Sequence, residues 1–522
     1  MNFNFKKNIC LFMAGVSISI VSAQEKKISD LTSFKLRNSG TLMDKEMDVD
    51  GYYLFYEMDK LKKGQREFSI QMMDKNLNEI ANKSYVDHKN VSLVDSKFNN
   101  QALLFAFSNP GSENYKAIIF DRNANEVQNI EIPSNKKEKQ WMSQLMAQGQ
   151  ANMIFTVDNK GFLFNHVIDN KKIGYGLKYI PTDGGNAWDY NSPTDVKEIK
   201  MINPIEANDK VVIALEMTKK SMLSGSVSMR IVVLDVNNGK LLFDRDYSRK
   251  DDPRFITNAF LKDDNSLVLL GEYFKSGDNI FKDKSLGLFA ETTDLNGNKL
   301  NDSKVSWENK IGKIMAEADP KDDNKMSKGY IYFHDIIRNQ DGSYYAIGER
   351  YKKTISAGGL AMTMLSRGAG NSTQLTITDA VMFKFDKDFS LLDAEVITKG
   401  KSRIPIPGAF TGPQLAAHYI NAIGGFDYQF TQIDTKRDRF YSSFIDYERI
   451  KGDKNKWSFT TLMHQDGKFA KDKIYLDTPN KSTYRRVLPG KLGHVVIMDY
   501  DKKEKSLDIH LEKLNFEIGL SK

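Results

Sequence analysis

The chain has 522 residues and a net charge of +7, from 75 Lys and Arg against 68 Asp and Glu. Its basic residues are scattered, which argues against the basic arms or stripes of nucleic-acid-binding proteins. Cys10 is the only cysteine, so the sequence offers no disulfide and, beyond it, no thiol nucleophile or thiolate metal ligand. We expect no nucleic-acid partner and a fold whose stability depends on its core.

Residues 1–23 have the order of a secretory signal peptide. Lys6 and Lys7 form a short positive segment, and an almost entirely apolar or small stretch follows over residues 9–21. The small residue Ala23 ends the segment, and the next residues are polar. This order of charge, apolar run and small residues predicts cleavage by signal peptidase.

Two other interpretations fit this segment less well. A membrane anchor needs about 20 apolar residues. A lipid anchor needs a cysteine at the end of the apolar stretch, whereas Cys10 stands near its beginning. We therefore predict that the mature chain begins at Gln24 and is exported to the periplasm, the cell surface or the medium. No later stretch is long enough for a transmembrane helix, so none is expected after cleavage.

Short strand-like runs dominate the rest of the chain. They are rich in apolar, β-branched or aromatic residues and are bounded by Asn, Asp, Gly or Lys, as at residues 52–56, 102–107 and 211–215. Helical periodicity is clearest over two short stretches, residues 138–149 and 411–422. The pattern predicts an all-β fold.

A turn sequence recurs after these runs. It starts with aspartate and is rich in asparagine, with copies that begin at Asp74, Asp121, Asp235, Asp294 and, in a weaker form, Asp386. Two copies contain Asn-Gly, at 238–239 and 296–297, which is a strong hairpin signal because both residues tolerate positive φ. Each copy is predicted to join two strands.

A longer repeat is visible in the second half of the chain. Residues 260–274 align without gaps on residues 337–351. Four of the identical residues lie in the turn and at the end of the core strand: Asp264, Ser266, Gly271 and Glu272 recur as Asp341, Ser343, Gly348 and Glu349. Both copies are typical of a strand, a tight turn and a core strand. A repeated unit of four strands predicts one β-propeller-like domain over 24–522, with about six to eight four-stranded blades.

The repeat, carried best by residues 255–300 and 332–396, resembles blades of exported bacterial propeller-like proteins. The whole chain resembles a functionally uncharacterised family of exported proteins from Gram-negative bacteria. This resemblance implies location and fold and supplies no catalytic residues. Blade lengths are uneven, and neither the Trp-Asp motif nor the Asp-box is present in strict form, so the number of blades stays open.

Two insertions interrupt the repeats, at 354–373 and 402–425. Both are largely apolar, contain glycine and have no acidic residue. Long loops on a rigid scaffold often bind ligands, so each is a candidate for a lid, a partner contact or a membrane-touching loop. The alternative is an internal plug or a packed surface loop.

Glu272 and Glu349 are the candidates for catalysis, because they occupy equivalent points of two repeats. Two carboxylates brought close together could serve as acid and base. The alternative is that each bonds to turn amides or lysines as part of the structure.

Asp294, Asn296 and Asn298 resemble the start of a calcium-binding loop. The twelfth position of that loop needs glutamate but here is Val305, so turn chemistry is the favoured interpretation. Trp188 and Tyr190 are candidates for stacking on a sugar, with a buried tryptophan of a blade as the alternative.

No motif indicates a cofactor. No two histidines stand three or four residues apart, and there is no nucleotide-binding glycine loop and no Gly-x-Ser-x-Gly elbow. The sequence favours an exported, non-catalytic binding or scaffold protein with an unknown protein or glycan partner at the cell envelope. The alternative is a propeller-fold glycan hydrolase or lyase that uses carboxylates facing the channel. An outer-membrane barrel is disfavoured, because the strands are short and charged.

Overall fold

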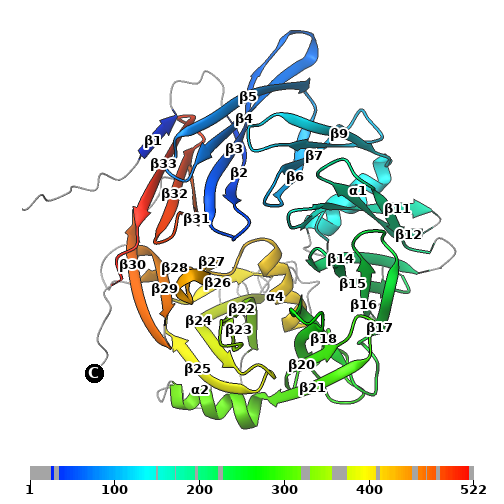
Figure 1. Cartoon of the computed structure of the whole chain (residues 1–522), viewed down its shortest axis with the longest axis vertical. Coiled ribbons are helices and arrows are strands. Elements are labelled where there is room, and N and C mark those ends of the chain that lie inside the picture. Colours follow the sequence, from blue (N-terminus) through cyan, green and yellow to red (C-terminus); the bar gives the residue numbers. More distant parts are fainter. Residues whose placement is uncertain are drawn as a thin grey trace, which may run out of the picture.

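The structure is a computed structural model in which eight antiparallel sheets form a ring (Figure 1). It describes the following residues: 25–28, 35–147, 151–170, 172–193, 198–221, 227–318, 330–355, 373–406, 412–448, 456–465, 467–477 and 482–516. The prediction of a β-propeller with about six to eight four-stranded blades is confirmed, with eight blades.

Blades 1 to 4 each consist of four strands that follow one another in sequence, running outward from the ring centre. Blade 1 has β2 (Lys35–Met43), β3 (Val49–Lys60), β4 (Gln65–Asp74) and β5 (Glu79–His88). Blade 2 has β6 (Ser92–Phe98), β7 (Leu103–Ser108), β8 (Tyr115–Phe120) and β9 (Glu126–Ile132). Blade 3 has β10 (Ile154–Val157), β11 (Gly161–Asn170), β12 (Lys172–Pro181) and β13 (Trp188–Asn191). Blade 4 has β14 (Ile199–Ala207), β15 (Val211–Lys219), β16 (Val227–Asp235) and β17 (Leu241–Asp246).

Blades 5 to 7 follow the same plan, and blade 8 differs. Blade 5 has β18 (Arg254–Leu261), β19 (Leu267–Tyr273), β20 (Gly287–Thr293) and β21 (Lys299–Ser306). Blade 6 has β22 (Tyr330–Arg338), β23 (Tyr344–Ile355), β24 (Thr373–Phe385) and β25 (Leu391–Ile397), and β26 (Ser402–Pro405) pairs with β24. Blade 7 has β27 (Tyr428–Asp434), β28 (Arg439–Glu448), β29 (Lys456–Gln465) and β30 (Lys468–Leu476). Blade 8 has β31 (Thr483–Pro489), β32 (His494–Asp501), β33 (Ser506–Lys513) and β1 (Glu25–Ile28).

Blade 8 closes the ring with strands from both ends of the chain. β1 is antiparallel to β33, with Glu25 opposite His510 and Ile28 opposite Leu507. In Figure 1 the blue strand β1 lies beside the red strand β33. Closure removes the need for an open edge between the first and last blades, and it brings β31 next to β2.

Apolar side chains fill the spaces between neighbouring blades. Between blades 1 and 2, the ring of Phe55 lies 5.4 Å from that of Phe68 and 4.8 Å from that of Phe105. All three rings are buried. Strands that are apolar on both faces are expected in a fold whose sheets pack face to face, and this packing stabilises the ring.

The aspartate turn joins the third and fourth strands of blades 1, 2, 4, 5 and 6. In the copy at Asp294, Oδ1 accepts hydrogen bonds from the backbone N–H groups of Asn296 and Asn298, at 2.9 and 2.8 Å. Gly297 alone of these residues has positive φ, +82°. The turn is therefore a three-residue hairpin loop with one left-handed residue, whereas an Asn-Gly turn of the two-residue type would need positive φ at both.

Six of the eight innermost strands contain a β-bulge where they pair with the second strand. In blades 1, 2, 4, 5, 6 and 7, the extra residue of the bulge is respectively Arg37, Val94, Ile205, Thr257, His334 and Gln429. In the repeated pair of segments, a Cβ on Gly271 or Gly348 would lie 2.0 or 2.6 Å from a carbonyl oxygen of the bulged strand. The repeated glycine is thus required by close backbone approach at the bulge.

The helices lie in the segments that connect or follow strands and are not part of the eight sheets. α1 (Lys136–Ala147) precedes blade 3, and α4 (Pro413–Ala422) packs on β22 and β23 on the inner side of the ring (Figure 1). Both predicted helices are confirmed. A π-helical turn, η2 (Trp307–Ile311), runs into α2 (Gly312–Ala318), which packs against β25. The short 3-10 turns are η1 (Lys62–Gly64) and η4 (Thr435–Arg437). Among the described residues, no helix has the length and apolar character that a membrane span needs.

The two predicted insertions lie in blade 6. Residues 356–372 of the first lie outside the described residues. The second contains β26 and α4, whose residues Ala416, Ala417 and Ile420 are buried. Its described part therefore packs on the inner side of blade 6, as the plug interpretation expects.

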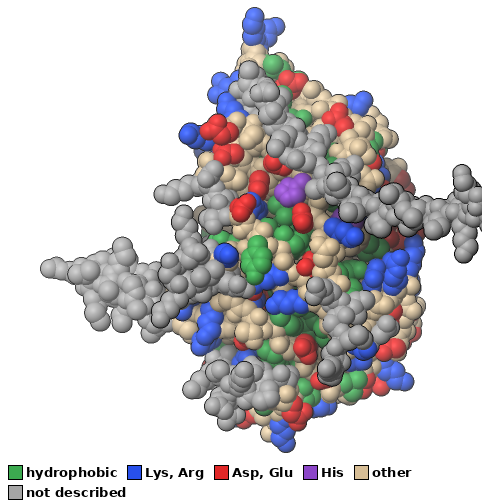
Figure 2. All heavy atoms as spheres, turned by 90° about the vertical axis from the view of Figure 1, so that its left-hand side faces the viewer, with side chains coloured by type: hydrophobic (Ala, Val, Ile, Leu, Met, Phe, Trp, Pro, Cys, Tyr) green, Lys and Arg blue, Asp and Glu red, His purple; other side chains and the backbone are tan. Residues whose placement is uncertain are grey.

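The face of the ring drawn in Figure 2, on the left of Figure 1, has mixed charge. Lys and Arg side chains lie among Asp and Glu, with hydrophobic side chains between them (Figure 2). Among the described residues visible in this view, no patch of a single sign dominates.

Candidate functional site

The innermost strands of blades 8, 1 and 2 line a cavity of about 590 Å³. Residues 36–41 of β2 form one wall, and residues 95–98 of β6 and Tyr484 and Arg486 of β31 form others. Tyr53, Tyr500 and Lys502 complete the lining. The volume falls within the range of small-molecule sites, about 300–1,000 Å³.

Cations dominate this cavity, which we call the cationic cavity. Four basic side chains line it, and they are Arg37, Lys97, Arg486 and Lys502. Among the described lining residues the single acid is Asp95. An excess of positive charge in a concave site attracts anions and concentrates them.

Three of these four cations form no salt bridge with a carboxylate among the described residues. Arg37 pairs with Glu57, whose other oxygen meets Arg66. Arg486 instead donates from Nη1 to the carbonyl oxygen and to Oγ of Ser39, at 2.6 and 3.1 Å. Within the described ranges, the ammonium groups of Lys97 and Lys502 have neither a salt bridge nor a hydrogen bond. These groups are therefore available to an anion.

The acid of the cavity, Asp95, accepts hydrogen bonds from two backbone N–H groups. Asp95 accepts a hydrogen bond at Oδ2 from the N–H of Ile154, 3.0 Å away, and at Oδ1 from the N–H of Ser96, 2.8 Å away. Burial raises the pKa of Asp95 above its ordinary value. The cavity therefore holds one carboxyl group against four basic side chains, and the charge of Lys97 acts on that carboxyl group.

Tyr53 fixes the geometry of the wall between blades 1 and 2. Its hydroxyl donates to Oδ1 of Asn38 at 3.0 Å and lies 3.3 Å from Oγ of Ser96. A Cβ on Gly40 would lie 2.6 Å from the Tyr53 ring, so glycine is needed there. The cationic side chains thus stand on a rigid part of the ring.

Glu349, one predicted catalytic candidate, is fully buried on β23. Its Oε2 lies 3.0 Å from Nε2 of His334 and accepts a hydrogen bond from the N–H of Tyr428 at 2.9 Å. Nζ of Lys399 lies 2.9 Å from its Oε1. Burial alone would raise the pKa of Glu349, but Lys399 and His334 outweigh it and lower the pKa to about 2. The arrangement is a buried ion pair.

Glu272, the equivalent residue of the other repeat, is buried on β19 beside α4. Nε2 of Gln414 lies 3.4 Å from its Oε2. Burial raises the pKa of Glu272 to about 7. Glu272 and Glu349 share no hydrogen-bond partner among the described residues.

Trp188 and Tyr190 stand on β13, the outer strand of blade 3. The Trp188 ring is buried, stacks on Tyr179 at 5.4 Å, and donates from Nε1 to the carbonyl of Val236 at 2.7 Å. Tyr190 stacks on Tyr175 at 6.3 Å. The observed surroundings of Trp188 are those of a residue packed between blades 3 and 4.

The turn that contains Asp294, Asn296 and Asn298 is exposed, and hydrogen bonds within the turn satisfy the Asp294 carboxylate. Besides the two backbone bonds, Oδ2 of Asp294 accepts from Nδ2 of Asn298 at 2.8 Å. These bonds lower the pKa of Asp294. Within the described ranges, no three His, Cys, Asp or Glu side chains come together as a metal ion would require.

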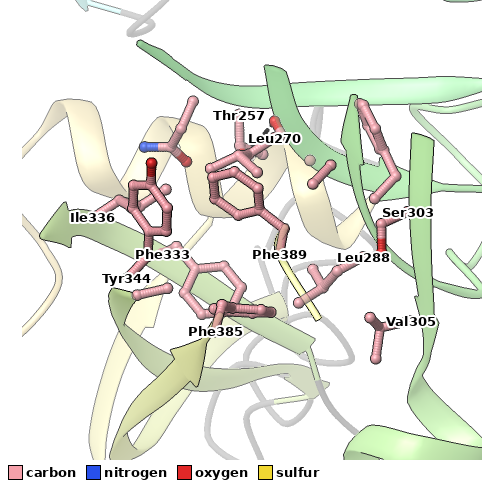
Figure 3. Close-up of a pocket in the computed structure, with 15 residues that line it drawn as sticks. Thr257, Leu270, Leu288, Ser303, Val305, Phe333, Ile336, Tyr344, Phe385 and Phe389 are labelled. Atoms are coloured by element: carbon pink, nitrogen blue, oxygen red, sulfur yellow. Dashed lines mark hydrogen bonds between the residues drawn. The ribbon is translucent and has the colours of Figure 1, made fainter. Parts of the chain in front are cut away.

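Two cavities in blades 4 to 6 are weaker candidates. Figure 3 shows one between blades 5 and 6, of about 40 Å³, with aromatic side chains such as Phe333, Phe385 and Phe389 around it. A space of this size and apolar character is a packing gap.

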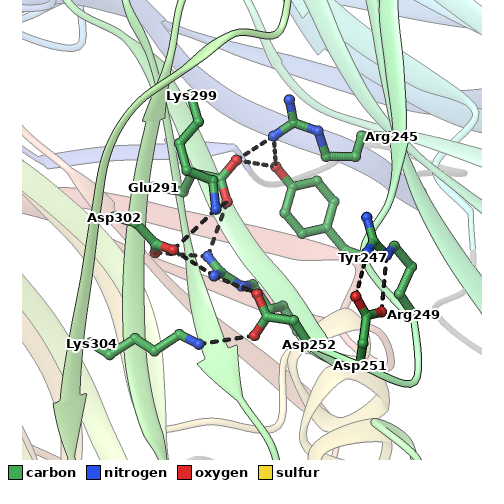
Figure 4. Close-up of polar contacts among 10 residues, drawn as sticks. Arg245, Tyr247, Arg249, Asp251, Asp252, Glu291, Lys299, Asp302 and Lys304 are labelled. Atoms are coloured by element: carbon green, nitrogen blue, oxygen red, sulfur yellow. Dashed lines mark hydrogen bonds and ion pairs between the residues drawn. The ribbon is translucent and has the colours of Figure 1, made fainter. Parts of the chain in front are cut away.

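The other cavity, of about 280 Å³, lies beside the polar network of blades 4 and 5 in Figure 4. There the buried Arg254 donates to Glu291 at 3.0 Å and to Asp302 at 2.7 Å. Each basic side chain of its lining is paired with an acid; these side chains are Arg245, Arg249, Arg254 and Lys299. Because its charges are balanced, it is a weaker candidate for an anion site than the cationic cavity.

A family model described as a family of unknown function (DUF6770) matches residues 5–515. The chain belongs to this family. A comparison with proteins of curated function found no match. The family membership confirms the expected resemblance to a functionally uncharacterised family.

Solved structures similar to the chain share its fold only distantly. Prolyl oligopeptidase B from Galerina marginata is 11% identical, with a TM-score of 0.40 over 90% of this chain and 55% of its own. The β-propeller domain of the Trilobed protease from Pyrococcus furiosus is 10% identical, with a TM-score of 0.36 over 86% of this chain and 99% of its own. The chain thus spans little more than half the length of the oligopeptidase.

The residues of the cationic cavity were missed by sequence reasoning. Arg37 and Arg486 stand at opposite ends of the sequence and belong to no motif. The signal that could have found them is topological, because the innermost strands of the first and last blades become neighbours when a propeller closes.

Proposed function

We propose that the protein is an exported, non-catalytic binding protein of the cell envelope whose ligand carries an anionic group bound in the cationic cavity. One observation carries the proposal: three cations that form no salt bridge within the described ranges, Lys97, Arg486 and Lys502, line one cavity of the ring. All three side chains are solvent-exposed, so they are open to a ligand, and charge-assisted hydrogen bonds to an anion are strong.

The chemistry of the cavity favours binding over hydrolysis. A glycan hydrolase needs two carboxyl groups that flank the bond to be broken. The cationic cavity has only Asp95 among its described lining residues, and that side chain accepts two backbone hydrogen bonds. The acids proposed for the alternative function are both buried: Glu272 lies beside α4, and Glu349 is paired with Lys399.

Export is the second part of the proposal. It is supported by the order of charged, apolar and small residues over 1–23. Intact-mass measurement of protein from a fractionated native host tests this part. A mature chain starting at Gln24 outside the cytoplasm is expected, and an uncleaved cytoplasmic chain would contradict it.

Anion binding is tested by titrating sulfate into the mature chain at low ionic strength, with calorimetry as the readout. The double variant Lys97→Gln/Arg486→Gln should weaken sulfate binding at least about tenfold, because each charged hydrogen bond contributes about 1.5–3 kcal/mol. The control is Lys62→Gln/Arg249→Gln, which removes two charges elsewhere on the ring. Equal affinity in all three proteins would overturn the proposed site.

A further inference from the structure

The cationic cavity continues into a second cavity between blades 7 and 8. This second cavity, which we call the interblade cleft, has a volume of about 870 Å³. Four residues line both spaces, and they are Gly40, Thr41, Tyr484 and Arg486. Arg486 therefore stands at the junction, with the other unpaired cations on one side and the cleft on the other.

The wall of the interblade cleft is rich in apolar side chains. It includes Ile423, Phe430, Ile445, Trp457, Leu476, Val487 and Leu488. Several are accessible, since Ile423 is 48% exposed and Trp457 is 41% exposed, and Tyr484 at the junction is 57% exposed. Exposed aromatic and aliphatic side chains that gather around one concavity are typical of a ligand-binding groove.

The polar groups of the cleft leave one cation for a ligand. Arg485 is held by Asp499, with Nε and Nη2 donating at 2.7 and 2.6 Å. Among the described residues of the cleft, Arg486 is the cation without a carboxylate partner. The site thus presents a positive end and a largely apolar length, with Asp477 as the one acid among its described lining residues.

We infer that the ligand is a small amphiphilic anion, an acidic group joined to an aliphatic chain. This inference rests on the proposed function and names its ligand class. The acidic group is bound by Arg486, with Lys97 and Lys502 in the same cationic cavity. The aliphatic chain lies along Ile423, Trp457 and their neighbours in the cleft.

An aliphatic chain suits this cleft better than an extended peptide. Methylene groups need no hydrogen bonds from the walls, whereas every peptide unit must satisfy a donor and an acceptor. The volume of about 870 Å³ lies in the range of small-molecule pockets, about 300–1,000 Å³.

The test compares octanoate, acetate and octanol by calorimetry on the mature chain. Octanoate should bind at least about 100-fold more tightly than acetate, because it buries six more carbon atoms. It should also bind at least about tenfold more tightly than octanol, which lacks the charge. Tryptophan fluorescence should change on octanoate binding, and Trp457→Phe should remove most of that change.

Two variants test separately the part of the site that binds the acidic group and the part that binds the aliphatic chain. Arg486→Gln should weaken octanoate at least about tenfold and leave octanol unchanged. Ile423→Ser should weaken both octanoate and octanol, whereas Ile80→Ser, an equally exposed isoleucine on β5, should weaken neither. Both isoleucines are partly exposed, so folding is expected to survive, and circular dichroism verifies it.

The outcomes separate this inference from the proposed function. If sulfate binds at Arg486 but octanoate binds no better than acetate, the aliphatic part of the inference is wrong and the anion site stands. If octanoate binds to Arg486→Gln and to Ile423→Ser as tightly as to the wild type, it binds elsewhere and the inference is overturned. If neither sulfate nor octanoate binds, the proposed function itself fails.

Discussion

Nζ of Lys399 lies 2.9 Å from Oε1 of Glu349, and both side chains are almost completely buried. Lys399 follows β25, so the pair ties blade 6 to the segment that leads through β26 and α4 to blade 7. The same ammonium also contacts Asp427, which accepts hydrogen bonds from Oγ of Ser402 at 2.7 and 2.9 Å. A repeated glutamate thus anchors an inserted segment in this blade.

Lys399→Met should destabilise the protein strongly. The substitution leaves the Glu349 carboxylate buried without its counter-charge, which costs about 3–5 kcal/mol in comparable cases. Urea unfolding followed by circular dichroism measures the change in the free energy of unfolding.

The double variant Lys399→Met/Glu349→Gln should recover part of that loss, because the unpaired charge of Glu349 is gone, while Asp427 still lacks the ammonium group that it contacts in the wild type. Arg249→Met, which breaks an exposed pair with Asp251, is the control and should change stability little. A loss below about 1 kcal/mol in Lys399→Met would contradict a buried ion pair.

Glu272→Gln should change how stability depends on pH. Glu272 has a folded-state pKa of about 7, raised by burial from 4.5. The folded state therefore keeps its proton more tightly than the unfolded state, and stability falls as pH rises from about 4.5 to about 7. The accumulated cost above pH 7 is on the order of 3 kcal/mol.

The glutamine variant has no such titration. It should therefore be more stable than the wild type at pH 8, with a flatter profile between pH 4.5 and 7, in urea unfolding at a series of pH values. Glu349→Gln provides the contrast. The pKa of Glu349 is lowered to about 2, so its contribution is present above pH 4.5 and is lost as pH falls toward 2. Parallel profiles for Glu272→Gln and the wild type would refute the raised pKa.

The features that the sequence predicted are those set by local chemistry. The aspartate turns rest on bonds between residues two and four apart, as between Asp294 and Asn298, and turn chemistry of this range can be read in one sequence. The repeated Gly271 and Gly348 follow from the bulge that each faces, so self-similarity was enough to find the blades.

The cationic cavity could not be predicted in the same way. Arg37 enters it from a β-bulge, which redirects a side chain without a sequence signature. Arg486 becomes its neighbour through closure of the ring and donates to Ser39, 447 residues away. Local periodicity carries no information on contacts of that separation. The same limit applies to Glu349, whose partner Lys399 lies outside its own repeat.

Asp294→Ala should lower the melting temperature by the same amount in calcium and in EDTA. The carboxylate accepts three hydrogen bonds within its own turn, and their loss weakens the turn whether or not calcium is present. Differential scanning fluorimetry in both buffers is sufficient. A wild-type melting temperature that rises with calcium, and a variant that does not respond, would instead identify an ion site in this turn.

Gly239→Ala should destabilise the protein more than Gly64→Ala. Both glycines have positive φ, +68° and +75°, so both variants incur a left-handed strain of about 1–2 kcal/mol. A Cβ on Gly239 would also lie 2.5 Å from Cε3 of Trp188, whereas a Cβ on Gly64 meets nothing within 4 Å.

Trp188 has little room to yield, because it stacks on Tyr179 and donates to Val236. Overpacking there should add about 1–3 kcal/mol to the cost of Gly239→Ala, measured as the difference between the two variants in urea unfolding. The near-ultraviolet circular dichroism of the tryptophans should change in Gly239→Ala alone. Equal losses in the two variants would mean that the Trp188 ring moves freely, and the contact between blades 3 and 4 would then not depend on it.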